Sequence, residues 1–228
     1  MRILATTKMQ SAICVAGVDP DNKWVRPVPR DGLNFQADQL AEGGRVVAEP
    51  YNEVDFSAIR VLANRPQSED VEVDPESGPR LVRSLSDNEI ATLCAKLDQY
   101  EIVSSQRDPP DRSGLTLENF LLSQGHSLIL SRVSQVHGAS RNYFSGQGKY
   151  RIQFAVGDAE YDLPCTDLRW RALARDSGDS AAVAQLAASQ RLYFVLGLTR
   201  VFRQRYWPMV IGVHPLPRLS AQVDYARL

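Results

Sequence analysis

Apolar residues recur along this chain in short runs separated by turn-forming residues. Runs of about 4–8 residues with alternating or continuous apolar character predict β-strands. In the N-terminal part these runs are Arg2–Thr7, Ala12–Val18, Lys23–Val28, Arg45–Glu49 and Asp55–Leu62. In the C-terminal part they are Ser127–Val136, Tyr150–Val156, Glu160–Leu163, Leu192–Leu198 and Trp207–His214. Asp19–Asn22 and Gly157-Asp158 are expected to form hairpin turns, because both are rich in turn residues.

Helical sequence falls at the same place in each half of this pattern. A short helix is expected at Phe35–Ala41, and two more at Thr166–Arg175 and Ala181–Arg191. Each half then has the order strand, strand, strand, helix, strand, strand, which matches the five-stranded OB-fold. We therefore predict a mainly β protein with a few helices (α+β), built from two OB-like five-stranded barrels in tandem. The barrels are expected at residues 1–66 and 116–228.

Residues 67–115 are expected to link the two barrels. The stretch Glu69–Glu101 is acidic, and Ser86–Glu89 has the sequence of a capping box. After it, Ile90, Leu93 and Leu97 fall on one helical face. These features predict a helix at 87–99 within an acidic linker.

Charge is distributed unevenly over the 228 residues, although the net charge is only −1. No Asp or Glu occurs between Glu118 and Asp158, or between Asp179 and Asp224. Local basic surfaces of this kind are compatible with binding to an anionic polymer. The hydrophobic share of 43% is sufficient for a sizeable core.

The cysteines and the apolar runs bear on the compartment. Cys14, Cys94 and Cys165 are far apart and form no metal-binding or disulfide motif, so free thiols are expected. The apolar run at the N-terminus is too short for a signal peptide, and no run approaches the roughly 20 apolar residues of a membrane span. We expect a cytoplasmic protein without membrane contact.

The second barrel carries the strongest candidate binding site. OB-folds bind ligands on strands 2 and 3, between the loop joining strands 1 and 2 and the loop joining strands 4 and 5. These loops are expected at His137–Lys149 and Thr199–Tyr206, and both are basic, aromatic and free of acids. Arginines pair with phosphates and aromatic rings stack on unpaired bases. The candidates are Arg141, Tyr143, Phe144, Lys149, Arg200, Phe202, Arg203, Arg205, Tyr206 and Trp207. The alternative is an amphipathic strand at Thr199–Trp207 with solvated arginines and buried rings.

The first barrel offers a weaker version of the same site. Lys8 lies in its expected 1–2 loop, and Trp24 and Arg26 share one side of its third strand. They predict a second stacking platform. The alternative places Trp24 in the core and Arg26 at the barrel rim.

Motifs for catalysis are absent from the sequence. His126, His137 and His214 show no metal-ligand spacing, and Gly146–Lys149 lacks the rest of a phosphate-binding P-loop. We expect no enzymatic activity, no metal and no cofactor.

Three segments resemble a known family. They are Ile13–Asp19 continuing to Lys23–Val28, Cys165–Trp170, and Phe194–Arg200 continuing to Trp207–Val213. Together they resemble bacterial dual OB-domain proteins over nearly the whole chain. The resemblance implies nucleic-acid binding in bacterial genome maintenance or phage conflict, and it supplies no catalytic residues.

The leading hypothesis is a module that binds single-stranded or structured DNA or RNA. Two alternatives stay open. One is a protein-interaction adaptor whose acidic linker docks a partner. The other is a small-nucleotide sensor or hydrolase that uses the same cleft.

Overall fold

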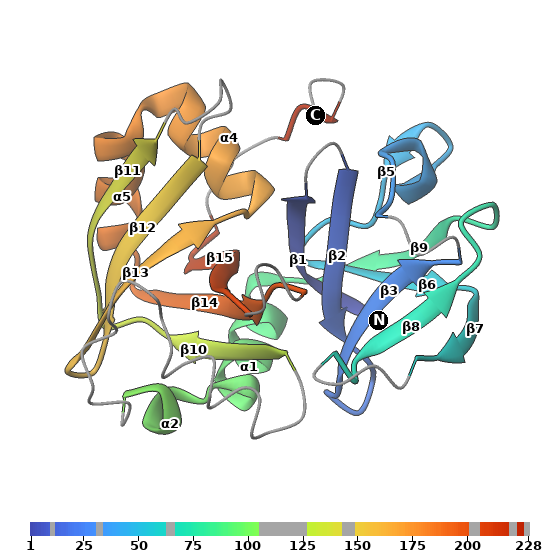
Figure 1. Cartoon of the computed structure of the whole chain (residues 1–228), viewed down its shortest axis with the longest axis horizontal. Helices are drawn as coiled ribbons and strands as arrows, with labels where there is room; N and C mark the ends of the chain where they lie inside the picture. The colour runs from blue at the N-terminus through green and yellow to red at the C-terminus, as the bar shows by residue number, and fades with distance from the viewer. Residues whose placement is uncertain are drawn as a thin grey trace.

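Two curled β-sheets lie side by side and form the body of the protein (Figure 1). The computed structural model describes residues 1–9, 12–30, 34–62, 67–104, 127–142, 149–200, 206–218 and 223–225. One sheet has seven strands and the other has six, and a two-stranded hairpin accompanies the first. The predicted class, mainly β with a few helices and two OB-like barrels, is confirmed.

The first sheet has the connectivity of an OB barrel. Strands β1 (Arg2–Met9), β2 (Ala12–Val18) and β3 (Trp24–Pro29) form an antiparallel meander, and β3 pairs in parallel with β8 (Asp70–Val73). Strands β6 (Asn52–Phe56) and β7 (Ala58–Val61) are separated only by Ser57, yet β6 pairs with β1 and β7 pairs with β8. The pair β6–β7 is therefore one bent strand that closes the sheet on itself. Strand β9 (Pro79–Ser84) extends the sheet beyond β6.

The predicted fourth strand of this barrel was wrong, and the predicted fifth strand was given the wrong place in the order. The run Arg45–Glu49 contributes only β5 (Arg45–Val46), which pairs with β4 (Ala41–Glu42) around two glycines of positive φ. The run Asp55–Leu62 belongs to the fourth strand. The fifth strand is β8, in the segment expected to be a linker. The acidic residues of this segment predicted exposure to solvent. Asp70 and Glu72 are instead buried, and they pair with Arg26 and Arg60.

The second sheet repeats this connectivity. Strands β11 (Gln135–Asn142), β12 (Lys149–Val156) and β13 (Ala159–Cys165) form the meander, and β13 pairs in parallel with β15 (Pro208–Leu216). Strand β15 pairs with β14 (Arg191–Leu198), and β14 pairs with β10 (Leu128–Arg132). Only Val133 and Ser134 separate β10 from β11, which lie at opposite ends of the strand order. The first strand thus bends and closes this barrel.

The predicted 1–2 loop of the second barrel was too long. Residues 137–142 of the expected loop belong to strand β11, and Lys149 already begins β12. Only residues 143–148 can form the loop, and they lie outside the described residues. The predicted strand Ser127–Val136 corresponds to β10 and the first residues of β11.

The helices follow the sequence closely. Helix α1 (Asp87–Leu97) confirms the helix predicted at 87–99, including its capping box at Ser86 and Glu89. A short helix α2 (Tyr100–Ser104) follows it. Helices α4 (Leu168–Ser177) and α5 (Asp179–Ala187) lie between the third and fourth strands of the second barrel. The helix expected at Phe35–Ala41 is only the 3₁₀ turn η1 (Asp38–Leu40). No described helix is long and apolar enough to cross a bilayer.

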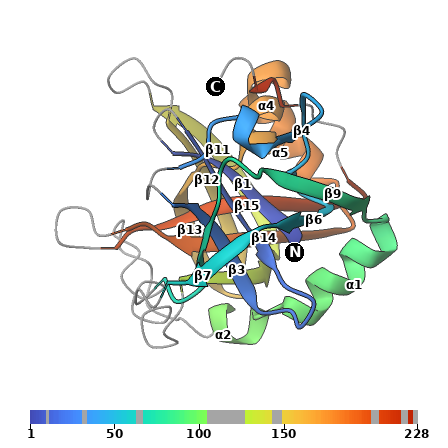
Figure 2. The same ribbon diagram turned by 90° about the vertical axis from the view of Figure 1, so that its right-hand side faces the viewer.

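Each barrel has its own core, and a third apolar cluster lies between them. Ile3, Ile13 and Val15 belong to the first core, and Phe154, Trp170 and Phe194 to the second. The cluster between the barrels combines Leu4, Ala16 and Val18 with Tyr193, Val195 and Ile211, and α1 adds Ile90 and Leu93. Figure 2 shows α1 beside the first barrel. The three cysteines are free thiols, as predicted.

Candidate nucleic-acid interface

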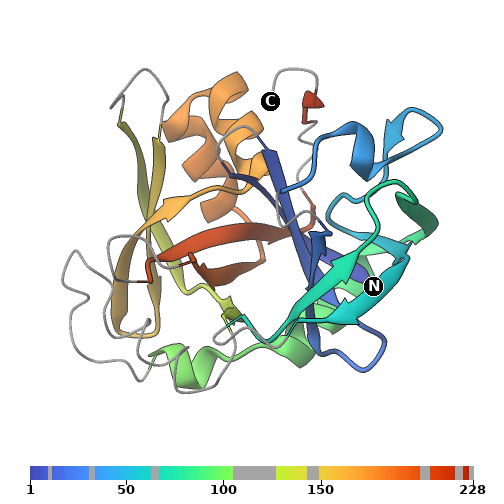
Figure 3. The same ribbon diagram turned by 45° about the vertical axis from the view of Figure 1, so that its right-hand side comes forward.

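The outer face of the first barrel is covered where an OB-fold would bind its ligand. Along β2, Ile13 and Val15 face the first core, whereas Ala16 and Val18 belong to the cluster between the barrels. Trp24 of β3 packs against that same cluster. Figure 3 shows β1 next to β15 of the second barrel, with β2 beside it. The second barrel therefore packs on β1 and on the Ala16–Val18 end of β2, and so covers part of this face.

Arg26 lies in a buried ion pair rather than on an open platform. Its Nε donates to Asp70 Oδ1 at 2.6 Å, and its Nη2 lies 3.6 Å from Glu69 Oε1. Only 10% of its side chain is exposed. A guanidinium held in this way has little capacity left for a phosphate. The geometry favours the structural alternative that the sequence left open for Trp24 and Arg26.

Lys8 lies at the junction of the two barrels. Its backbone N–H donates to the carbonyl of Thr166 at 3.1 Å, and its side chain is half-buried. The contact joins the end of β1 to the residue that follows β13. This contact does not place Lys8 beside the expected binding loops of the second barrel.

The corresponding face of the second barrel is exposed. Tyr150, Phe154 and Tyr161 point inward and are buried, while Lys149, Gln153, Glu160 and Asp162 are exposed on the outer side of β12 and β13. Arg151 Nε lies 2.9 Å from Asp162 Oδ1, and His137 Nε2 lies 3.0 Å from Glu160 Oε2. This face is therefore close to charge-balanced, and its two strands expose no aromatic ring within the described residues.

Positive charge gathers instead at the base of the 1–2 loop. The guanidinium of Arg141 lies 4.9 Å from the ring centroid of Tyr150, and that of Arg171 lies 5.5 Å from the same ring. Lys149, which precedes Tyr150 in β12, is exposed on the opposite side of the strand. Burial lowers the pKa of Arg171, and the charge of Arg141 lowers it further. Two cations that share one ring form a site where a phosphate oxygen would relieve their repulsion.

Arg171 was not identified from the sequence as a binding residue. It lies in the first turn of α4, where an arginine is usually a solvated surface group. Within the described part of the chain, no carboxylate pairs with it. Only the packing of α4 against the end of the barrel brings it to Tyr150.

The base of the 4–5 loop is built on the first barrel. The N–H of Thr199 donates to Trp207 O at 3.0 Å, and the N–H of Trp207 donates to Thr199 Oγ1 at 2.9 Å. Gln67 Nε2 of the first barrel donates to Thr199 O at 3.3 Å. Arg200 is 63% exposed, and its Nη2 lies 3.8 Å from Asp70 Oδ2. Tyr206 packs against the second core and is only partly exposed.

The remaining candidates lie outside the described residues. They are Tyr143, Phe144, Phe202, Arg203 and Arg205. The structure thus places Arg141 and Lys149 at one loop base and Arg200, Tyr206 and Trp207 at the other.

The two-barrel fold agrees with the protein family that the sequence matches. The family model of the dual OB-containing domain (DuOB) matches residues 1–213. The chain belongs to the dual OB-containing domain family. A search among curated proteins found no match. OB-folds commonly bind nucleic acids, so the fold of this dual OB-containing domain is compatible with that activity.

A second group of buried polar residues joins the barrels of this dual OB-containing domain. Asp167 caps α4 by accepting from Trp170 N at 2.6 Å, and it also accepts from Val213 N at 3.3 Å. Burial raises the pKa of Asp167 to about 6. His214 Nδ1 lies 3.1 Å from the Tyr51 hydroxyl, and burial lowers the pKa of His214 to about 3. These groups are buried, so we assign them to the junction and not to a ligand site.

No metal centre is found in the part of the chain that the structure describes. There, no three His, Cys, Asp or Glu side chains lie together in an arrangement that could hold an ion. His137 of β11 pairs with Glu160 of β13 in the second barrel, and His214 contacts Tyr51 at the junction of the barrels.

Proposed function

We propose that the second barrel binds single-stranded or structured nucleic acid across the outer face of β12 and β13. The observation that carries this proposal is the asymmetry between the barrels. The first barrel's corresponding face is partly covered by residues of β14 and β15, whereas that of the second is exposed and has basic residues at both ends. The strands β11 and β12 lie on the side of the molecule farthest from the first barrel (Figure 1).

Phosphate contacts would come from two clusters. Arg141, Lys149 and Arg171 lie at the base of the 1–2 loop, and Arg200 lies at the base of the 4–5 loop. Arg203 and Arg205 would add to the second cluster. Stacking would come from loop rings, because β12 and β13 present none in their described residues. The candidates are Tyr143, Phe144, Phe202, Tyr206 and Trp207.

The setting that we propose is the bacterial cytoplasm, in genome maintenance or phage conflict. This part of the proposal rests on the resemblance of the chain to bacterial dual OB-domain proteins. The free thiols are compatible with a reducing compartment.

Fluorescence anisotropy with labelled single-stranded and double-stranded DNA and RNA tests the proposal. Arg171→Gln is the informative variant, because it removes one charge at the loop base without entering the core of the sheet. The salt dependence of binding should flatten by about 0.7 in log K per log salt for one lost contact to a single strand. Arg80→Gln is the matched control, since Arg80 is an exposed arginine on β9 of the first barrel.

Wild-type protein that binds none of these nucleic acids at about 50 mM salt would overturn the proposal. Equal salt slopes for wild type and Arg171→Gln, with binding retained, would remove Arg171 from the interface. A small-nucleotide activity of the same cleft would show as binding of mononucleotides that long strands do not compete away.

One observation favours a protein partner as the second candidate. Strand β7 lies at an edge of the first sheet and exposes Ile59 by 46% and Val61 by 70%. Exposed apolar edge strands are common sites for pairing with a strand of another protein. The acidic segment is a weaker docking surface than the sequence suggested, because Glu69, Asp70 and Glu72 are buried.

A further inference from the structure

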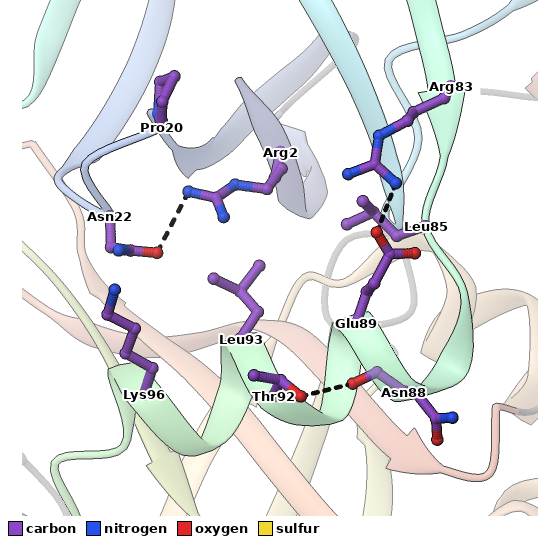
Figure 4. A pocket seen from close by; sticks show the side chains of 10 residues that line it. All are labelled: Arg2, Pro20, Asn22, Arg83, Leu85, Asn88, Glu89, Thr92, Leu93 and Lys96. Atoms are coloured by element: carbon purple, nitrogen blue, oxygen red, sulfur yellow. Dashed lines mark hydrogen bonds and ion pairs between the residues drawn. The ribbon is translucent and has the colours of Figure 1, made fainter.

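A cavity of about 420 Å³ lies between α1 and the first barrel (Figure 4), and no residue of β12 or β13 lines it. This volume is in the range of small-molecule sites. Arg2 of β1, Asn22 of the β2–β3 turn and Lys96 of α1 contribute polar groups to it, and Leu85 and Leu93 contribute apolar wall. A ligand with a polar end and an organic body would match such a lining.

The acidic side chain of this cavity is already neutralised. Glu89 lies 2.5 Å from Arg83 Nη1, and it accepts from the backbone N–H of Ser86 at 2.9 Å. The hydrogen bonds from Ser86 have the largest effect, and together with the contact to Arg83 they lower the pKa of Glu89 to about 2. Arg83 is also paired with Glu53 at 2.9 Å. Arg83 is therefore paired with two carboxylates and is not available as a cation for a ligand.

Two cations of the cavity have no such partner. Among the described residues, the side chain of Arg2 donates to neutral acceptors, which are the carbonyl of Asp19 and Oδ1 of Asn22, the second at 3.2 Å. Among the described residues, no carboxylate pairs with Arg2 or with Lys96. Figure 4 shows both side chains extending toward Asn22 from different elements. The cavity thus presents two positive charges around one carboxamide.

The turn that holds Arg2 is closed by its own hydrogen bonds. Asn22 has a φ of 66°, and its N–H donates to Asp19 O at 3.1 Å. The N–H of Lys23 donates to Asp19 Oδ1 at 2.9 Å, which closes the turn. Leu93 is buried beneath the cavity and anchors α1 to the barrel. Preorganised donors lose little freedom on binding, which favours affinity.

We propose that this cavity binds the phosphate group of a phosphate monoester, with Arg2 and Lys96 as its partners. Two cations match the double negative charge of a monoester, and Asn22 supplies a further neutral donor. The apolar wall at Leu85 and Leu93 would contact the organic part. The monoester is either a free nucleotide-sized molecule or the 5′-phosphate end of a nucleic-acid strand.

Isothermal titration calorimetry of the full chain with adenosine 5′-monophosphate, adenosine and inorganic phosphate tests this site. The monophosphate should bind, and adenosine should bind at least about tenfold more weakly, because it lacks the charge-assisted contacts. Lys96→Gln should weaken the monophosphate by about tenfold. Lys23→Gln is the control, since Lys23 is exposed on the same turn but does not line the cavity.

Lys96 is exposed on α1, so its substitution should leave the thermal unfolding of the protein unchanged. Arg2 also holds the Asp19–Asn22 turn, so Arg2→Gln could lower the stability of the fold. The binding of this variant is therefore compared with its thermal unfolding curve. A single strand with a 5′-phosphate that binds more tightly than its 5′-hydroxyl form, with the difference lost in Lys96→Gln, assigns the phosphate to a strand end. Monophosphate binding without that difference assigns it to a free molecule.

Three results would overturn the site: no heat with the monophosphate at millimolar concentration, equal binding of monophosphate and adenosine, or Lys96→Gln equal to wild type. Arg171→Gln separates this proposal from the nucleic-acid face. It should weaken long-strand binding by the second barrel and leave monophosphate binding unchanged.

Discussion

Gly212 lies in β15 directly against the first barrel. A Cβ atom at this position would stand 2.6 Å from the carbonyl oxygen of Leu4, which belongs to the other barrel. A backbone oxygen in a strand cannot move without disturbing the pairing of β1. The absence of a side chain at Gly212 therefore sets the distance between β15 and β1.

Gly212→Ala should lower the free energy of unfolding by about 1–3 kcal/mol through overpacking at this junction. Urea unfolding followed by tryptophan fluorescence would measure it. Gly138→Ala is the control, because its Cβ would meet only Gln153 Oε1, the end of a flexible exposed side chain, at 3.1 Å. Equal stability of the two variants would contradict the close approach.

His214 and Asp167 oppose each other in the pH dependence of stability. His214 has a pKa of about 3 when folded against 6.5 unfolded, so acidification below about 6.5 protonates the unfolded state first and destabilises the fold. Asp167 has a pKa of about 6 when folded against 3.8 unfolded, so its protonation between about pH 6 and 4 stabilises the fold. The two contributions partly cancel between pH 4 and 6.

His214→Gln should expose the contribution of Asp167, because glutamine does not titrate and can still meet the Tyr51 hydroxyl. The free energy of unfolding of this variant, relative to wild type, should rise as the pH falls from about 6 to 4. Asp167→Asn should show the opposite trend, a steeper loss on acidification. Urea titrations at several pH values would measure both, and parallel profiles for all three proteins would refute the assignment.

At the scale of elements, α1 illustrates how local sequence decides a boundary. Ser86 Oγ accepts from Glu89 N at 3.4 Å, and Glu89 Oε2 accepts from Ser86 N at 2.9 Å. These bonds satisfy backbone donors that a helix start leaves open. Ile90, Leu93 and Cys94 then bury one face of the helix.

Ser86→Ala should cost about 1 kcal/mol of stability by removing this cap. Thermal or urea unfolding would measure the loss. Ser177→Ala, an exposed serine at the end of α4 whose hydroxyl donates to Leu173 O at 2.8 Å, should change stability by less than about 0.5 kcal/mol. If the cap forms in solution, Ser86→Ala should be clearly less stable than Ser177→Ala.

At the scale of the whole molecule, the barrels are joined by apolar packing and by a buried polar network. Glu69 accepts from the backbone N–H of Ser127 at 3.2 Å and from its hydroxyl, and Gln67 reaches Thr199. Residues of the first barrel's 4–5 segment thus hold the start of the second barrel and the base of its 4–5 loop. A nucleic acid on the β12–β13 face would meet a loop whose base is fixed by the other barrel.

The same packing makes the barrels unequal, although their strand orders are alike. We expect one exposed OB face per chain, on the second barrel, and this expectation is tested by the Arg171→Gln and Arg80→Gln pair above. The first barrel contributes the cavity beside α1 and the support for the junction.

The sequence by itself determined the strand-rich class, the order of elements in the second barrel, the capped helix α1 and the place of the second barrel's 4–5 loop. These features depend on neighbours within a few residues, such as the alternation in β12 or the Ser86–Glu89 pair. The continuous apolar run Ala12–Val18 is typical of a strand that is buried on both faces, because such a strand loses the alternation of apolar and polar residues.

Only the tertiary structure decided which residues face a ligand and which face the other barrel. The acidic residues of β8 made this strand look like a solvent-exposed linker in the sequence. Their partners Arg26 and Arg60, which pair with Asp70 and Glu72, lie at least ten residues away along the chain. Arg171 joins Arg141 at Tyr150 only through the packing of α4. Long-range pairing and burial between barrels have no period in the sequence, so the choice between the two OB faces belongs to the fold.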